Sequence, residues 1–159
     1  MEAWINPYDF SQRRPIFEWH NGTNTFGTHM WILAPGEAGL GAGNLYVNVV
    51  TEENYLLLAA PGGTLTTNTL QHVAATFDKA SGWMRIYRNA ELVAEENFSG
   101  WYDSDPETSY DLYLGARPAG DGACLFKGII DEASIYNRAL SQEEIEDIYN
   151  AGSNGKCPN

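Results

Sequence analysis

The chain has 159 residues, of which 43% are hydrophobic and 13% aromatic, so it carries enough apolar side chains for one packed core. Its 21 acidic and 9 basic side chains give a formal net charge of −12, which opposes binding to nucleic acid or an anionic membrane. The longest apolar run, residues 56–60, is far shorter than the roughly 20 residues of a membrane-spanning helix. The sequence therefore predicts one folded domain over residues 1–159, without membrane insertion.

Most of the chain alternates between apolar and polar residues with a period of two, which is typical of half-buried β-strands. The alternation is clearest in four segments: 2–6, 29–33, 45–50 and 112–117. Loops rich in Gly, Pro, Asn and Asp separate the strands, notably at 34–44, 61–64 and 103–109. Strands and turn signals at these spacings favour an all-β sandwich of two antiparallel sheets.

Further along the chain, residues 83–88 continue through Asn89 and Ala90 into 91–96, which predicts a tight hairpin. A type I′ turn prefers Gly at its second position, so Ala90 should lower stability or force another turn. Only one segment looks helical; it follows Ser141 and ends at Gly152. Ser141 and Glu144 form a capping box before it, and Ile145, Ile148 and Tyr149 share one face.

Four stretches together resemble the laminin-G-like domains of the concanavalin-A-like superfamily: 2–7 (EAWINP), 72–78 (HVAATFD), 83–94 (WMRIYRNAELVA) and 128–149 (GIIDEASIYNRALSQEEIEDIY). The resemblance implies a jelly-roll sandwich of two antiparallel sheets with one short C-terminal helix. It also implies one or more strands before EAWINP. We therefore expect an N-terminal edge strand to be missing or supplied by another chain, with self-association through an open sheet edge.

Alternation also sorts the side chains by face, because successive strand residues point to opposite sides of a sheet. Aromatic rings, amides and guanidinium groups on an outward face suit a sugar, since rings stack on it and polar groups bind its hydroxyls. Glu18 and His20 could join this face or be ordinary surface residues. The predicted ligand-binding set is Trp4, Trp31, Tyr46, Asn48, Tyr113 and Arg117. The alternative is that Trp4 and Trp31 are buried by a loop or by the other sheet.

The resemblance further implies a calcium ion at the rim of the sandwich, bound by carboxylates and carbonyls. Asp131 is the first candidate, because alternation predicts it among inward-pointing Ile129, Ala133 and Ile135, where a carboxylate needs a partner. Calcium or a hydrogen-bond network would satisfy it. Flexible acidic loops supply the other candidate ligands, Asp103, Asp105 and Asp121, with a simply solvated loop as the alternative.

Catalytic motifs are absent from the sequence. No Glu precedes an Asp by two residues, as the paired acids of glycosidases with this sandwich do, and neither a GxSxG nor an HExxH motif occurs. Cys124 and Cys157 lack CxxC spacing, and a disulfide or two free thiols both remain open. The sequence favours a non-catalytic, lectin-like module of a larger secreted or cell-surface protein. The alternative is a protein-interaction, adhesion or spacer module without glycan binding.

Overall fold

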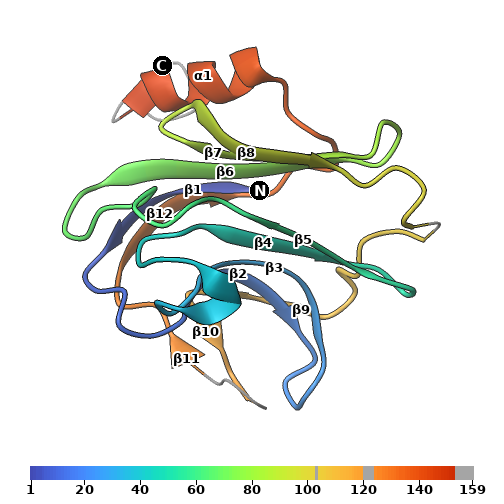
Figure 1. Ribbon diagram of the computed structural model, residues 1–159, viewed down its shortest axis with the longest axis horizontal. Helices are drawn as coiled ribbons and strands as arrows, with labels where there is room; N and C mark the ends of the chain where they lie inside the picture. The colour runs from blue at the N-terminus through green and yellow to red at the C-terminus, as the bar shows by residue number, and fades with distance from the viewer. Residues whose placement is uncertain (103, 120–123, 153–159) are drawn as a thin grey trace.

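The computed structural model describes residues 1–102, 104–119 and 124–152, and it is a sandwich of two five-stranded antiparallel sheets (Figure 1). The first sheet has the order β12-β1-β6-β7-β8: Gly128–Ser134, Glu2–Pro7, Gln71–Asp78, Trp83–Arg88 and Glu91–Asn97. The second has the order β5-β4-β3-β2-β9: Tyr55–Ala59, Tyr46–Val50, Phe26–Ile32, Arg14–His20 and Asp111–Leu114. A two-stranded ribbon, β10 (Ala116–Arg117) and β11 (Cys124–Leu125), and a 3-10 turn at Glu37–Gly39 complete the strand layers. The predicted two-sheet sandwich is confirmed.

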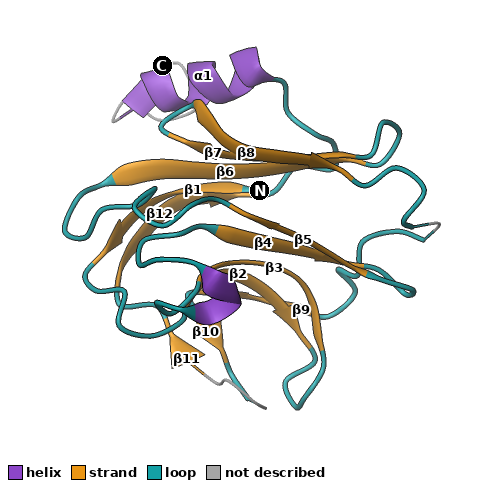
Figure 2. Cartoon of the chain, viewed as in Figure 1, coloured by secondary structure: helices purple, strands orange, loops and turns teal. Residues whose placement is uncertain are grey.

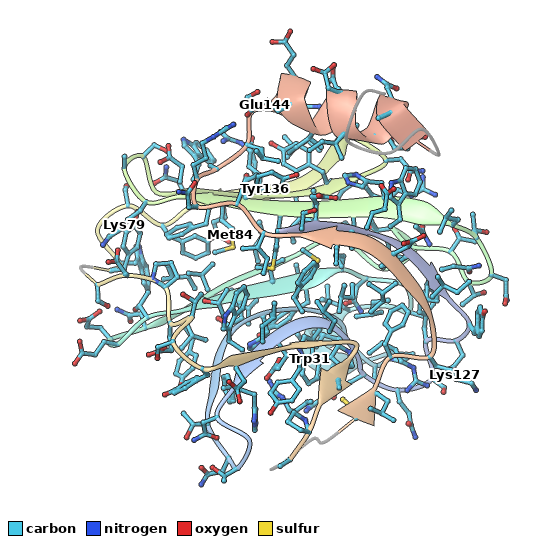
Figure 3. The ribbon with its side chains drawn as sticks, turned by 180° about the vertical axis from the view of Figure 1, so that it is seen from behind. Trp31, Lys79, Met84, Lys127, Tyr136 and Glu144 are labelled. Carbon is cyan, nitrogen blue, oxygen red and sulfur yellow. The ribbon has the colours of Figure 1, made fainter. Side chains whose placement is uncertain are left out.

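The core lies between the sheets and follows the predicted alternation. Strand β1 contributes Ala3 and Ile5, and β3 contributes Met30 and Ile32, all fully buried. Figure 3 shows Met84 between the two sheets and Trp31 within the second sheet, toward β10. Strands β2 and β4 are buried along their whole lengths, so the outward-facing side chains of these two strands are also covered.

Helix α1 (Gln142–Ala151) lies on the outer face of the first sheet (Figure 2). The predicted capping box is present, with Ser141 accepting from the Glu144 amide while the Glu144 side chain accepts from the Ser141 amide. Ile145 is fully buried and packs against Ala74 and Tyr87 of the sheet. No helix in the described part of the chain is long and apolar enough to cross a membrane.

The β7–β8 hairpin keeps the two-residue turn despite its unfavourable second residue. Asn89 and Ala90 both have positive φ angles, 50° and 65°, as a type I′ turn requires. Two contacts hold the turn in place: the Asn89 side chain accepts from the His72 amide at 2.9 Å, and the Ala90 carbonyl accepts from Gln142 at 2.7 Å. The Ala90 methyl group is also buried beneath α1, which offsets part of the backbone cost.

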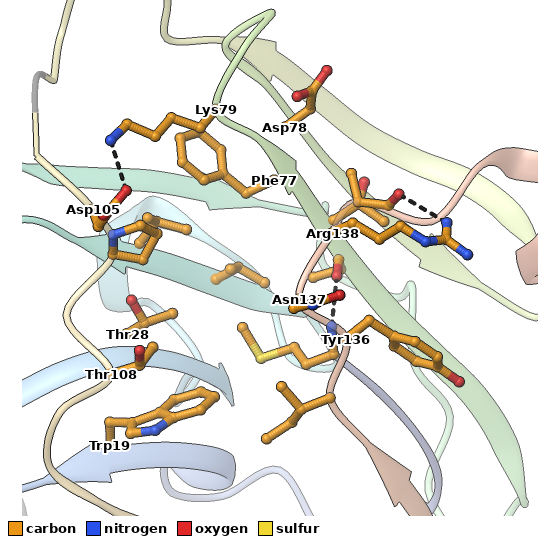
Figure 4. Close-up of a pocket in the computed structure, with 18 of the residues that line it drawn as sticks. Trp19, Thr28, Phe77, Asp78, Lys79, Asp105, Thr108, Tyr136, Asn137 and Arg138 are labelled. Carbon is orange, nitrogen blue, oxygen red and sulfur yellow. Dashed lines mark hydrogen bonds and ion pairs between the residues drawn. The ribbon is translucent and has the colours of Figure 1, made fainter.

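One side of the sandwich is open. Strand β5 packs against β7 and β8, so the edge strands β9 and β12 lie at the opposite side of the sandwich. Four large apolar side chains there are 39–50% exposed: Leu112, Leu114, Ile129 and Ile135. Between the sheets lies a cavity of about 790 Å³, whose wall includes Trp19, Phe77 and the Lys79–Asp105 ion pair (Figure 4).

Substitutions of Ala90 test the balance between the backbone cost of its positive φ and the burial of its methyl group. We expect Ala90→Gly to change the free energy of unfolding by less than about 1 kcal/mol, because relief of the left-handed backbone offsets the lost methyl burial and the added chain entropy. We expect Ala90→Val to destabilise by about 2 kcal/mol or more, because a β-branched residue strongly resists positive φ. Urea denaturation measures both. A tolerated Val would show that the turn does not hold this conformation in solution.

Candidate functional site

A row of polar side chains crosses the outer face of the second sheet. The strand register pairs Tyr113 with Glu18, Glu18 with His29 and His29 with Asn48, so these four residues lie side by side on β9, β2, β3 and β4. Trp31 and Tyr46 form the neighbouring pair. The face is outward because the alternate residues, such as Met30 and Val47, fill the core.

Four of these residues, His29, Asn48, Trp31 and Tyr46, form the floor of a pocket of about 300 Å³. The ribbon strand β10 places Arg117 over the sheet, and segments before and between β2 and β3 add the remaining wall. The described lining consists of Arg13, His20, Asn24, Phe26, His29, Trp31, Leu33, Tyr46, Asn48 and Arg117. The structure thus brings together four of the six residues predicted to bind a ligand: Trp31, Tyr46, Asn48 and Arg117.

A buried ion pair fixes the position of Arg117. The Glu18 side chain is fully buried, and its Oε1 atom lies 2.6 Å from Arg117 Nη2 and 2.8 Å from Nε. Its Oε2 atom accepts from Trp31 Nε1 at 2.6 Å. The guanidinium carbon also lies 4.1 Å from the Trp31 ring centroid and 4.8 Å from that of Phe26, within the range of cation–π attraction.

Burial controls the protonation of the groups around this pair. It raises the pKa of Glu18 to about 7, because loss of solvent outweighs the stabilisation of the carboxylate by Arg117 and Trp31. Burial also lowers the pKa of His29 to about 4, so this imidazole is neutral near pH 7. Nδ1 of His29 donates to the Gly27 carbonyl at 2.8 Å, which leaves its Nε2 atom as an acceptor.

Two more side chains contribute polar atoms to the pocket. His20 accepts from the Gly22 amide through Nδ1 at 3.0 Å, and burial lowers its pKa, so the neutral ring carries its proton on Nε2. The Asn48 side chain is 5% exposed, and its Oδ1 atom has no hydrogen-bond partner in the described part of the chain. Because a buried unpaired acceptor costs free energy, Asn48 points to a ligand that donates a hydrogen bond.

Trp4 does not belong to this site. It lies on the outer face of the first sheet, where its ring stacks on Tyr149 of α1 with centroids 5.6 Å apart and planes at 23°. Alternation correctly placed Trp4 outward but could not show that it belongs to the other sheet. Trp31 is only 3% exposed, as the burial alternative expected, and Arg117 covers it. Tyr113 shares the face but does not line the pocket.

The prediction that Asp131 is buried is wrong. A β-bulge shifts the register between β1 and β12, and Glu132 has a positive φ of 48°, so Ile130 turns into the core and Asp131 is exposed. Asp105 is exposed and pairs with Lys79 at 2.7 Å. Asp103, Asp121 and Cys157 lie outside the described residues. Within the described ranges, no group of three His, Cys, Asp or Glu side chains could hold a metal ion.

Sequence reasoning missed Arg13 and Phe26 as members of the site. Arg13 precedes β2, and Phe26 begins β3; neither carries a local pattern that would place it over the outer face of the second sheet. His29 was recognisable as outward-facing from its alternation with Met30. Glu18 and His20 also carried that signal, because they alternate with the apolar residues Phe17 and Trp19.

Comparison with known proteins supports the fold and shows the family. The model of a family described as concanavalin A-like lectin/glucanases superfamily (Laminin_G_3) matches residues 1–146. A search of curated proteins gives no match.

Solved structures with similar folds are distant in sequence. The sialidase module CBM40 of Ruminococcus gnavus, bound to α2,3-sialyllactose, has a TM-score of 0.73 at 18% identity, covering 93% of this chain and 80% of that one. Domain 4 of the extracellular arabinanase AbnA of Geobacillus stearothermophilus, in complex with arabinotriose, has a TM-score of 0.63 at 19% identity, covering 92% and 63%. The leech intramolecular trans-sialidase, complexed with 2,7-anhydro-Neu5Ac, has a TM-score of 0.69 at 17% identity, covering 92% and 22%.

The raised pKa of Glu18 predicts a specific pH dependence of stability. Because the folded pKa is about 7 and the ordinary value is 4.5, the folded state holds the proton more tightly, so this stabilisation is complete below pH 4.5 and is lost as pH rises through 7. Relative to Glu18→Gln, the wild type should therefore lose stability between pH 5 and pH 8, by a few kcal/mol at most. Urea denaturation at both pH values measures the difference. Parallel pH profiles for the two proteins would contradict the assignment.

Proposed function

Because the chain belongs to the concanavalin A-like lectin/glucanase superfamily, we propose that it is a non-catalytic carbohydrate-binding module that binds a glycan in the pocket on the second sheet. The observation that carries the proposal is Asn48, whose buried Oδ1 atom lacks a partner among the described residues in a pocket floored by Trp31 and Tyr46. A sugar hydroxyl would complete this hydrogen bond, and the aromatic floor would contact the apolar face of the ring.

The size of the pocket favours one sugar unit over a long chain. At about 300 Å³ it lies at the lower end of pockets that hold small molecules, about 300–1,000 Å³. Its walls are also deep, because Trp31 and Arg117 are each less than 10% exposed. We therefore expect binding to the end of a glycan, with the remaining units directed into solvent.

The arrangement of acids supports binding and not hydrolysis. Glycosidases need two carboxyl groups that flank the scissile bond, about 5–10 Å apart. The described lining of this pocket contains no carboxylate, and Glu18 lies fully buried beneath Arg117 and Trp31. Glu18 can therefore orient Arg117 but does not reach a substrate.

We place the module in a larger secreted or cell-surface protein. The arabinanase that contains a similar domain is described as extracellular, and a glycan at the cell surface suits a pocket that holds a chain end. A calcium dependence remains part of the proposal, since Asp103 and Asp121 are in acidic loops. Glycan binding measured with calcium and with EDTA tests it directly.

The pocket can be tested with a glycan array followed by isothermal titration calorimetry. We expect Asn48→Ala to weaken binding about five- to tenfold, the effect of one lost hydrogen bond. The matched control is Trp4→Phe on the opposite face, which should leave affinity unchanged. The absence of binding to any glycan, with and without calcium, would sink the lectin function.

The open side of the sandwich favours a second function, contact with another copy of the chain. Strands β9 and β12 are edge strands of the two sheets, and they carry the exposed side chains Leu114 and Ile129. Exposed edges of this kind pair readily with other strands. We propose self-association through this edge, as the resemblance implies.

The edge contact is testable by sedimentation velocity at increasing protein concentration. We expect the wild type to form dimers and the double variant Leu114→Lys/Ile129→Lys to remain monomeric, because charged side chains block edge pairing. The control is Leu57→Lys/Leu92→Lys, which places two charges on the opposite edge strands, β5 and β8, and should still dimerise. Monomeric wild type at all concentrations would exclude self-association.

A further inference from the structure

The pocket is lined by cations in a strongly acidic chain. Two of the chain's 9 Lys and Arg residues, Arg13 and Arg117, line it, while none of the 21 Asp and Glu residues is in its described lining. The pocket lining is therefore positively charged although the chain as a whole is negatively charged. A positively charged lining is complementary to an anionic ligand.

The acids that pair with these arginines do not line the pocket. Glu18 is fully buried between the sheet and Arg117, and Glu37 pairs with the Nε atom of Arg13 at 2.7 Å without joining the described lining. Each arginine is thus oriented by an acid, and guanidinium groups have five N–H donors, more than these contacts use. Nη1 of Arg117 has no hydrogen-bond partner among the described residues.

The other polar atoms of the pocket include both hydrogen-bond donors and hydrogen-bond acceptors, which restricts the class of ligand further. His20 Nε2–H and the Tyr46 hydroxyl are donors. Asn48 Oδ1 and His29 Nε2 are acceptors, each buried beside the aromatic floor. A simple anion such as phosphate would satisfy the donors alone. A ligand with both a carboxylate and hydroxyl or amide donors would satisfy both groups.

We propose that the pocket selects a terminal sugar that carries a carboxylate, a uronic or a sialic acid, whose carboxylate is bound by Arg117 and Arg13. The sugar's hydroxyl or amide groups donate to Asn48 and His29, and its ring lies against Trp31 and Tyr46. This inference rests on the proposed glycan-binding function and names its substrate class. Arg117 then bridges two carboxylates, the buried Glu18 and that of the ligand, which matches the planar fork of a guanidinium group.

The test uses ligands that differ only in charge. Calorimetric titration compares the methyl α-glycoside of N-acetylneuraminic acid and methyl β-D-glucuronide with the methyl ester of each, together with neutral methyl β-D-glucoside and methyl β-D-galactoside. We expect at least one of the two acids to bind tenfold or more tighter than its own ester. Which of the two acids binds distinguishes a site for a sialic acid from a site for a uronic acid.

Matched variants separate a local contact from a general charge effect. We expect Arg13→Gln to weaken binding of the preferred acid at least fivefold. Arg85→Gln, which removes an equal charge from the first sheet, where Arg85 pairs with Glu95, should leave the affinity unchanged. Equal losses in both variants would overturn the proposed contact.

The possible failures of this inference and of the proposed function differ. Esters or neutral glycosides that bind as tightly as the acids would overturn the carboxylate selectivity and leave glycan binding intact. No binding of any of the six sugars, with no glycan bound on the array, would overturn both.

Discussion

The burial of one carboxylate, that of Glu18, organises the functional face of the molecule. Glu18 lies on β2 of the second sheet with its side chain removed from water, and such a group must be paired or neutralised. Arg117 and Trp31 satisfy its two oxygens. Because Arg117 comes from β10, the ion pair also holds the β10–β11 ribbon over the sheet and thereby creates a wall for the pocket. Removal of one partner would leave the other charge buried without compensation. That loss costs far more stability than replacement of both partners by apolar side chains of similar volume.

The two outer faces of the sandwich differ in what covers them. Helix α1 closes the outer face of the first sheet, where Ile145 and Tyr149 pack over Ala74 and Trp4. Beneath it, His72 Nε2 lies 3.0 Å from Glu2 Oε2, and the Tyr136 hydroxyl donates to the other Glu2 oxygen at 3.2 Å. This polar cluster is sealed and stabilises the attachment of the C-terminal segment. The second sheet, which no α-helix covers in the described part of the chain, retains the recess.

The sequence was most informative where structure depends on neighbouring residues. Alternation assigned Met30 and Val47 to the core and Trp31 and Asn48 to the opposite face, and the Ser141 capping box marked the start of α1. The sequence was uninformative where the structure depends on pairing between strands that are far apart in the chain. Nothing local shows that Trp4 belongs to a different sheet from Trp31. Nor does alternation reveal a bulge, which inserts one residue into β12 and reverses the faces that follow.

The acidic surface and the cationic pocket act on an anionic sugar over different distances. The net charge of −12 repels an anion at long range, and salt screens this repulsion beyond about 8–10 Å. The Arg13 and Arg117 contacts act within hydrogen-bond distance and are screened much less. Repulsion therefore opposes approach and slows association, while the arginines slow dissociation. A polyanion would meet repulsion along its whole length and gain only one pocket, so the same charge distribution favours a single acidic sugar at the end of a neutral chain.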